Sequence, residues 1–216
     1  RIGNSLNRHQ ENRPMLKLYY HPLSTFTRRV LITLIEKAIP HELIPVDMAA
    51  REHNQPSYRA LNPYGRVPTL MEDDFVLYES TAILNYLEAI HPSPPLTPAD
   101  PRGRALVDMH MKLCDLELTR QTGTIIFPKR FLPEQRWNLA EMARAKAEIE
   151  QHLAILERSL AGREYLVAEM YSLAEVCYTP FVQFLPLMEI VPPPAVGAWA
   201  ERILNRPSAV RTRPSH

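Results

Sequence analysis

The chain has 216 residues, of which 45% are hydrophobic, and a formal net charge of +1 at pH 7. This length and composition suffice for one large domain or two smaller ones and exclude global disorder. Charges spread along the chain argue against nucleic acid as the main partner, and no apolar run approaches the roughly 18 residues of a membrane span, so no membrane partner is expected.

The first fourteen residues, Arg1 to Pro14, are polar and lack hydrophobic periodicity. Met15 stands directly before the first strand pattern, so we expect the natural start of the protein near Met15. Residues 1–14 are then interpreted as a tail left by cloning or processing. A disordered natural extension is the alternative.

An alternating run, Leu16 to Tyr20, predicts the first strand, and the helical pattern that follows is ended by Pro40. Ser24 lies at the turn between this strand and this helix. A hydroxyl at the positive end of a helix can hold a negative atom, although by its position alone Ser24 is a helix N-cap. Arg28 and Arg29 are predicted to be charges on the helix surface.

Residues 43–46 predict a second strand, which Pro45 places near a sheet edge. Residues 67–71 and 75–78 predict a hairpin, and Ser80 is predicted to cap the helix after it. The first crossover implies a parallel pair and the hairpin an antiparallel one. The order β-α-β and then β-β-α therefore predicts a small mixed sheet with helices on its faces.

Five prolines between His91 and Pro101 exclude a helix there and predict a stiff linker at residues 92–101. Every later pattern is helical, and the predicted helices cover residues 102–127, 134–160, a segment opened by the capping box Ser172–Glu175, and a last helix near 195–204. We therefore expect an α+β protein of two domains, a βαβ-ββα domain at residues 15–91 and an all-α helical domain at residues 102–216.

The two cysteines, Cys114 and Cys177, lie far apart in the sequence and both within helical patterns. This placement is typical of reduced, buried thiols in a cytoplasmic protein. It does not indicate a disulfide framework or a metal site.

The two-domain pattern with its proline-rich linker resembles the soluble glutathione transferases, over Met15 to about Pro207. The motifs that carry this resemblance are Ser24-Thr25 with Arg29-Val30, Glu52 to Pro56, Leu61 to Pro68, and Tyr78 to Ile83. The first motif resembles the active-site segment of serine-type members, and the others look most like the phi class. The resemblance implies a thioredoxin-like first domain, glutathione as co-substrate, no metal and a homodimer.

Three positions depart from the phi-class pattern. Those proteins often carry lysine where Asn54 stands, glutamine where Arg66 stands, and aspartate at the position of Glu175. The motifs therefore define the superfamily more specifically than the subclass.

The resemblance makes Ser24 the candidate catalytic residue. A free thiol has a pKa near 8.5, so only about 3% of it is thiolate at pH 7. Lowering that pKa by two units takes about 2.7 kcal/mol, and one hydrogen bond to a charged group supplies about 1.5–3 kcal/mol. Ser24 need only donate a hydrogen bond to the sulfur and keep its own proton. Thr25, or a tyrosine such as Tyr19 or Tyr20, is the alternative donor.

The next candidates would hold the glutathione backbone and its γ-glutamyl end. A cis bond between Val67 and Pro68 would turn the N–H and C=O of Val67 outward to pair with the cysteinyl residue. Ser80 and the helix amides suit the γ-glutamyl carboxylate, and Glu79 suits the ammonium group.

The glycyl carboxylate is assigned to His53, Asn54 and Arg66, of which Arg66 fits best because a guanidinium binds a carboxylate through two parallel bonds. On a loop, His53 is otherwise a solvated surface residue. The electrophile pocket is expected in the helical domain, where the candidates are Met109, Leu116, Phe127, Arg130 and Phe131. Such an apolar stripe is otherwise plain core.

These assignments predict a detoxification enzyme of the EC 2.5.1.18 type that conjugates glutathione to hydrophobic electrophiles and also reduces peroxides. Thiol–disulfide exchange is disfavoured because no cysteine lies between Pro22 and Val30. A zeta-type isomerase is disfavoured because the serine-serine-cysteine turn is absent. A non-catalytic ligand-binding or regulatory protein on the same scaffold is the alternative function. Tyr58 is the candidate aromatic anchor of the homodimer.

Overall fold

The computed structural model describes residues 15–214, so the interpretation of residues 1–14 lies outside it. A four-stranded mixed sheet has the order β2-β1-β3-β4. Its central strand β1 (Leu16–Tyr20) pairs in parallel with β2 (His41–Pro45) and antiparallel with β3 (Thr69–Glu72), which forms a hairpin with β4 (Phe75–Tyr78). The predicted mixed sheet, with residues 41–45 at one edge, is confirmed.

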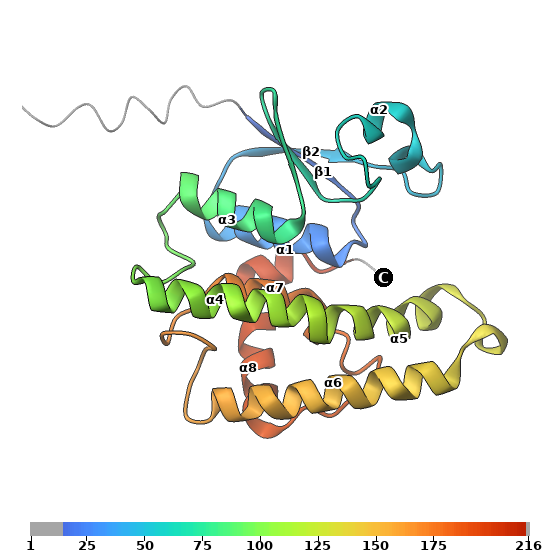
Figure 1. Cartoon of the computed structure of the whole chain (residues 1–216), viewed down its shortest axis with the longest axis vertical. Helices are drawn as coiled ribbons and strands as arrows, with labels where there is room; N and C mark the ends of the chain where they lie inside the picture. Colours follow the sequence, from blue (N-terminus) through green and yellow to red (C-terminus); the bar gives the residue numbers. More distant parts are fainter. Residues whose placement is uncertain (1–14, 215–216) are drawn as a thin grey trace, which may run out of the picture.

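Two helices of this thioredoxin-like domain, α1 (Thr25–Glu36) and α3 (Ser80–Ile90), lie between the sheet and the rest of the molecule. They pack against each other, and Val30, Leu34 and Leu84 are among their fully buried side chains. The short helices η2 (Glu52–Asn54) and α2 (Pro56–Arg59) lie away from the helical domain (Figure 1).

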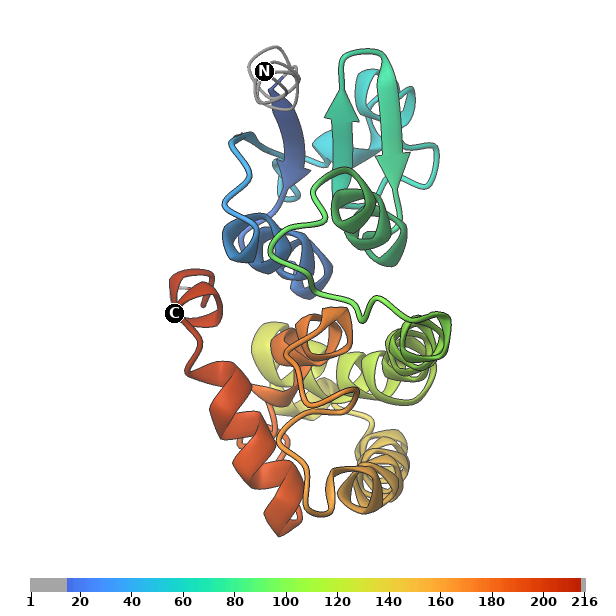
Figure 2. The same ribbon diagram turned by 90° about the vertical axis from the view of Figure 1, so that its left-hand side faces the viewer.

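The second domain is built entirely of helices (Figure 2). A long rod consists of α4 (Pro101–Leu113), the π-helical turn η3 (Cys114–Thr119) and α5 (Arg120–Phe131), and α6 (Leu139–Leu160) packs along α5. The short helix η4 (Glu134–Arg136) joins α5 to α6. Every residue of α7 (Leu173–Val182) is buried, because this helix packs against α1, α4 and α8 (Pro194–Leu204).

The helix near residues 195–204 was predicted to be the last one, and this was wrong. A short helix α9 (Pro207–Arg211) follows it and packs against α1 of the first domain. Its five residues are too few to show a hydrophobic period in the sequence. The domain boundaries at residues 91/92 and 101/102 stay predictions.

The apolar stripe that was named for the electrophile pocket does not lie in the core, so its alternative interpretation as plain core is wrong; Phe127 and Phe131 are 56% and 52% exposed. Leu106, Met109 and Leu116 are 47%, 46% and 54% exposed. The buried positions are instead Val107, Met111, Cys114 and Leu118. The segment carries two apolar stripes, and a sequence pattern alone does not tell which of them faces the core.

The capping box that opens α7 is confirmed, and it is fully buried. Glu175 is 0% exposed and accepts hydrogen bonds from the backbone N–H groups of Leu166 (2.8 Å) and Ser172 (2.9 Å). The hydroxyl of Ser172 donates to the same carboxylate at 2.6 Å and accepts from Ala174 N at 3.2 Å. Burial raises the pKa of Glu175, and these hydrogen bonds oppose the rise.

None of the helices in residues 15–214 is long and apolar enough to cross a membrane.

Replacing Ser172 by alanine removes both bonds of its hydroxyl and leaves the Glu175 carboxylate short of one donor. We expect Ser172→Ala to lower the free energy of unfolding by about 1–2 kcal/mol in chemical denaturation. Asn138→Ala is the matched control, because Asn138 caps α6 at an exposed site. A loss at Ser172 no larger than that at Asn138 would contradict this account of the buried box.

Candidate functional site

Ser24 occupies the N-cap position of α1, with φ −78° and ψ 117°. Its oxygen accepts a hydrogen bond from Thr27 N at 3.1 Å, and the side chain is half-buried. A hydroxyl that accepts from an amide keeps its own proton for another acceptor. Capping the helix and donating to a bound sulfur are therefore compatible roles.

Residues from three separated segments of the thioredoxin-like domain line one cleft of about 70 Å³. Its lining contains five of the predicted site residues: Arg66, Val67, Pro68, Glu79 and Ser80. The peptide bond between Val67 and Pro68 is cis, as expected. Ser24, His53 and Asn54 are not among the lining residues.

Two lining residues, Phe26 and Asn62, were missed by the sequence reasoning. Asn62 lies inside the motif that contains Arg66, and its side chain donates to the carbonyl oxygen of Arg66 at 2.9 Å. That position in the motif was the available signal. Phe26 lies in the first turn of α1, two residues after Ser24, and nothing in its spacing distinguishes it from an ordinary helix residue.

The loop that carries Arg66 is fixed from inside the protein. Tyr58 is 4% exposed, and its hydroxyl donates to the carbonyl oxygen of Arg66 at 2.7 Å. The prediction that Tyr58 anchors a dimer interface is therefore wrong, because its ring and hydroxyl are used within the fold. Gly65 has φ +60°, and a Cβ atom there would lie 2.7 Å from the carbonyl oxygen of His53. This position requires glycine.

The side chains of His53 and Asn54 contact each other outside the cleft lining. Nε2 of His53 lies 3.0 Å from Nδ2 of Asn54, and Oδ1 of Asn54 accepts from Arg59 at 3.0 Å. The side chain of Arg66 is exposed at the cleft. The assignment of these three residues to the glycyl carboxylate stays a prediction.

Ser80 does not cap α3, in contrast to the prediction. Glu79 occupies the N-cap position with φ +73° and makes no side-chain capping bond, and Ser80 is the first residue of the helix. The oxygen of Ser80, which is 5% exposed, instead accepts a hydrogen bond from Arg29 at 3.3 Å. The hydroxyl oxygen of Ser80, which would accept a backbone N–H in a helix cap, therefore accepts from the buried guanidinium of Arg29 instead.

Arg29 was predicted to be a surface charge, and it is 0% exposed. Its guanidinium forms an ion pair with Asp115 at 2.6 Å and donates to the carbonyl oxygen of Cys177 at 3.1 Å. Further donor bonds reach Sγ of Cys114 and Oγ1 of Thr119, each at 3.3 Å. The same group lies over the rings of Phe26 (5.1 Å) and Phe181 (4.9 Å).

The charge of Arg29 is maintained by these neighbours. Burial alone would lower its pKa, but the adjacent thiols and Asp115 raise the pKa above the ordinary value for arginine. Arg28 was also predicted at the surface and is 2% exposed. It donates to the carbonyl oxygen of Ala209 at 2.9 Å, so it ties α1 to α9.

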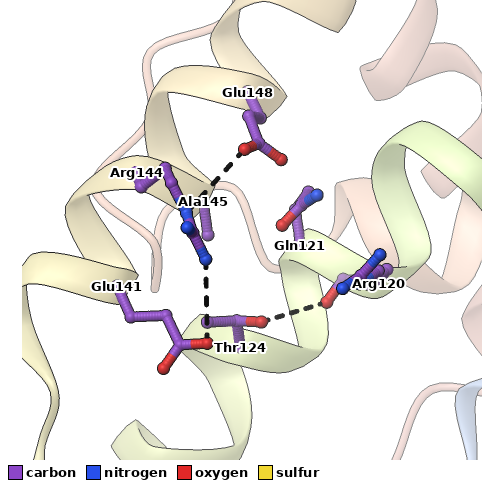
Figure 3. A pocket seen from close by; sticks show the side chains of 7 residues that line it. All are labelled: Arg120, Gln121, Thr124, Glu141, Arg144, Ala145 and Glu148. Atoms are coloured by element: carbon purple, nitrogen blue, oxygen red, sulfur yellow. Dashed lines mark hydrogen bonds and ion pairs between the residues drawn. The ribbon is translucent and has the colours of Figure 1, made fainter.

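A polar cavity of about 240 Å³ lies between α5 and α6, away from this cleft (Figure 3). The guanidinium of Arg144 lies 4.0 Å from Glu141 and 3.9 Å from Glu148, so the charges in this cavity largely balance one another. Within residues 15–214, no group of three or more His, Cys, Asp or Glu side chains could hold a metal ion. The small cleft beside α1 and α3 is the candidate site because it gathers five of the predicted site residues.

Known proteins place this architecture in one family. The model of the glutathione S-transferase N-terminal domain matches residues 18–95, and that of the C-terminal domain matches residues 125–207. Glutathione S-transferase F13 of Arabidopsis thaliana is 30% identical, over 92% of this chain and 95% of its own. The crystal structure of glutathione transferase F7 from Populus trichocarpa is 30% identical, has a TM-score of 0.81, and is matched over 92% of this chain and 97% of its own.

A glutathione transferase homologue from sulfitobacter, solved with bound glutathione, is 27% identical and has a TM-score of 0.77, with 91% of this chain and 96% of its own covered. A thioredoxin-like domain followed by a helical domain is the architecture of the glutathione S-transferases, and the chain belongs to that family. Within the family, the plant F-class relatives confirm the predicted likeness to the phi class.

The buried contacts of Arg29 generate a stability prediction. Arg29→Met leaves Asp115, Thr119 and the carbonyl of Cys177 without their donor, so we expect the free energy of unfolding to fall by about 3–5 kcal/mol. Asp115→Asn should cost less, because the Asp115 side chain is 29% exposed and water can replace part of the lost interaction.

The matched control is Arg211→Met, which removes an exposed arginine from α9. Denaturant unfolding of the three variants measures the loss in the free energy of unfolding. This loss should be largest for Arg29→Met, smaller for Asp115→Asn and smallest for Arg211→Met. An Arg29→Met protein as stable as the Arg211→Met protein would show that the buried guanidinium is not structurally required.

Proposed function

We propose that this protein conjugates glutathione to hydrophobic electrophiles, an activity of the EC 2.5.1.18 type, with the hydroxyl of Ser24 stabilising the glutathione thiolate. The observation that carries the proposal is the cleft, which brings Arg66, Val67 and Ser80 together from two segments. Phe26 also lines this cleft, and it lies two residues after Ser24 at the N-terminus of α1. The sulfur of a bound glutathione would therefore lie near the positive end of that helix.

In this proposal an extended glutathione pairs with the backbone of Val67 through its cysteinyl residue. Its γ-glutamyl carboxylate binds the hydroxyl of Ser80 and the first amides of α3, and its ammonium group binds Glu79. Its glycyl carboxylate binds Arg66, assisted by His53 and Asn54.

Arg29 strengthens the binding of the γ-glutamyl carboxylate through Ser80, without contacting the substrate itself. Its guanidinium donates to the oxygen of Ser80, so the proton of Ser80 is left for an acceptor in the cleft. Hydrogen bonds in such a chain polarise one another. The positive charge of Arg29 on the protein side of Ser80 therefore favours binding of a carboxylate on its cleft side.

The same thiolate can attack a peroxide oxygen, which breaks the O–O bond, releases the alcohol and leaves a glutathione sulfenic acid. A second glutathione then converts this sulfenic acid into glutathione disulfide and water, so glutathione-dependent peroxide reduction is part of the proposal. A cytoplasmic location is proposed as well, because the two cysteines are free and fully buried, and burial raises the pKa of the Cys114 thiol to about 11. A neutral buried thiol is unreactive, which suits a reducing compartment.

The test of Ser24 is its replacement by alanine. We expect Ser24→Ala to lower kcat/KM for 1-chloro-2,4-dinitrobenzene about 10- to 100-fold at pH 7, because one hydrogen bond to the thiolate is lost. The thiolate is the reactive form, so the pH–rate profile should move to higher pH and the deficit should shrink as pH rises.

Thr25→Ala is the matched control, since Thr25 is the neighbouring hydroxyl in the same turn, and it should retain the wild-type rate. Equal rates for Ser24→Ala and the wild type would remove Ser24 from its role. Failure to bind glutathione at millimolar concentration in calorimetry would favour a non-catalytic ligand-binding or regulatory protein on this scaffold.

We also propose a homodimer that buries the outer face of α4 and η3, the first two parts of the long rod. Leu106, Met109 and Leu116 form an exposed apolar stripe there, and contiguous exposed apolar surface marks interaction sites. Tyr64, 64% exposed in the loop that follows α2, replaces the buried Tyr58 as the candidate aromatic anchor.

The double variant Leu106→Glu and Met109→Glu should convert the dimer, of twice 24.9 kDa, into a monomer in analytical ultracentrifugation. Like charges placed on a self-complementary face repel each other in the dimer. Val191→Glu is the control, because Val191 is 90% exposed on a different surface. A double variant that sediments as the wild type would contradict this interface.

A further inference from the structure

A larger cavity of about 520 Å³ lies in the helical domain next to the C-terminal segment. Phe184, Pro186, Leu187 and Leu204 contribute apolar side chains to its lining, and Arg130 and Arg213 contribute the charges. A second cavity of about 410 Å³ shares Gln183, Pro186, Leu204 and Arg213 with the first. The two form one elongated groove along α8, called the C-terminal groove below.

The positive charges of this groove have no anionic partner among the residues that the structure describes. Within residues 15–214, neither the Arg130 nor the Arg213 guanidinium takes part in an ion pair or a side-chain hydrogen bond. Arg130 is half-buried over the rings of Phe131 (5.3 Å) and Phe184 (5.5 Å), so its position is fixed by packing. Glu201 lines the second cavity but lies beyond ion-pair distance of both arginines.

Arg28 adds a third positive charge behind Arg213. It is 2% exposed, its Nε donates to Oγ1 of Thr212 at 3.2 Å, and its Nη1 has no hydrogen-bond partner within residues 15–214. Burial and the nearby charge of Arg213 together lower the pKa of Arg28 to about 10. A buried cation repelled by a second cation is costly, and an anion bound at the groove would relieve that cost.

The lining of the groove is connected to the lining of the cleft through packed aromatic residues. Phe26, which lines the cleft, packs edge-on against Phe181 with ring centroids 5.9 Å apart. Phe184, which lines the groove, follows Phe181 by three residues. The packed pair Phe26 and Phe181 therefore connects the lining of the cleft with the segment that lines the groove.

We propose that the C-terminal groove binds the electrophile, and that this electrophile is an amphipathic monocarboxylate. Its apolar body lies against Phe184, Leu187 and Leu204, and its carboxylate pairs with Arg130 and Arg213. This inference rests on the proposed function, because it names the substrate class of the same enzyme.

A matched pair of probes tests the charge requirement: 4-chloro-3-nitrobenzoate and its uncharged methyl ester. In both, the glutathione thiolate forms a C–S bond at the carbon that carries chlorine, the C–Cl bond breaks, and chloride leaves with the bonding pair. The thiol proton goes to solvent. Each enzymatic rate is divided by the uncatalysed rate of the same compound, so that the intrinsic difference between acid and ester cancels.

The proteins compared are the wild type, Arg130→Gln, Arg213→Gln and the control Arg211→Gln, an exposed arginine of α9 outside the groove lining. We expect the acid-to-ester ratio of kcat/KM to fall about fivefold to tenfold in each groove variant and to stay at the wild-type value in the control. Calorimetric binding of acid and ester without glutathione should show the same change in preference.

The outcomes separate this inference from the proposed function. Turnover of the ester with an acid-to-ester ratio unchanged in both groove variants would overturn the charged groove and leave the transferase activity standing. Absence of all turnover would overturn the proposed function, and the calorimetric preference would then decide the groove alone. An equal loss in Arg211→Gln would assign the effect to general surface charge and overturn the proposal.

Discussion

The guanidinium of Arg29 is the buried charge around which the two domains are arranged. A buried cation has lost its hydration, and only well-aligned hydrogen bonds and ion pairs offset that desolvation penalty. It therefore needs hydrogen-bond acceptors on every side. The acceptors come from α3, η3 and α7, while Arg29 itself belongs to α1. These four elements must therefore meet at one place, and that meeting fixes how the sheet domain lies on the helical domain (Figure 2).

The π-helical turn η3 supplies three of the side chains that contact Arg29, namely Cys114, Asp115 and Thr119. A π-helical turn brings residues five positions apart onto the same face, and Cys114 and Thr119 have this spacing. Arg29 also donates to Ser80 of the cleft lining, so the helical domain and the candidate cleft share one network of hydrogen bonds. The network also places Phe26 between the cleft and α7.

The sequence was a good guide wherever a feature depends on local chemistry. The strands, the capping box of Ser172 and the buried cysteines follow from periodicity and from residue type, and the structure confirms them. The cis bond at Pro68 was expected from a proline at the head of a strand within a familiar motif. Five of the seven residues that line the cleft were found because they lie within two short motifs, whereas Phe26 and Asn62 were missed.

The errors arose where the deciding contacts are distant in sequence. Arg28 and Arg29 occupy a helix whose other faces are apolar, and arginine is rarely buried, so a surface position was the ordinary expectation. Their partners lie at residues 80, 114–119, 177 and 209, which no local pattern connects. Ser80 was assigned as a cap for the same reason, because the sequence does not show that Arg29, 51 residues away, donates to its hydroxyl oxygen. The buried stripe of α4 depended on which of two apolar faces α7 would cover.

In the proposed function, the hydroxyl of Ser24 alone lowers the thiol pKa of bound glutathione. An ultraviolet difference titration of the thiolate in the binary complex measures this pKa directly. The thiol pKa in the wild-type complex should lie about two units below the free value near 8.5. In Ser24→Ala with glutathione bound to saturation, the pKa should return to within about half a unit of the free value. Identical titration curves for the two complexes would contradict the account.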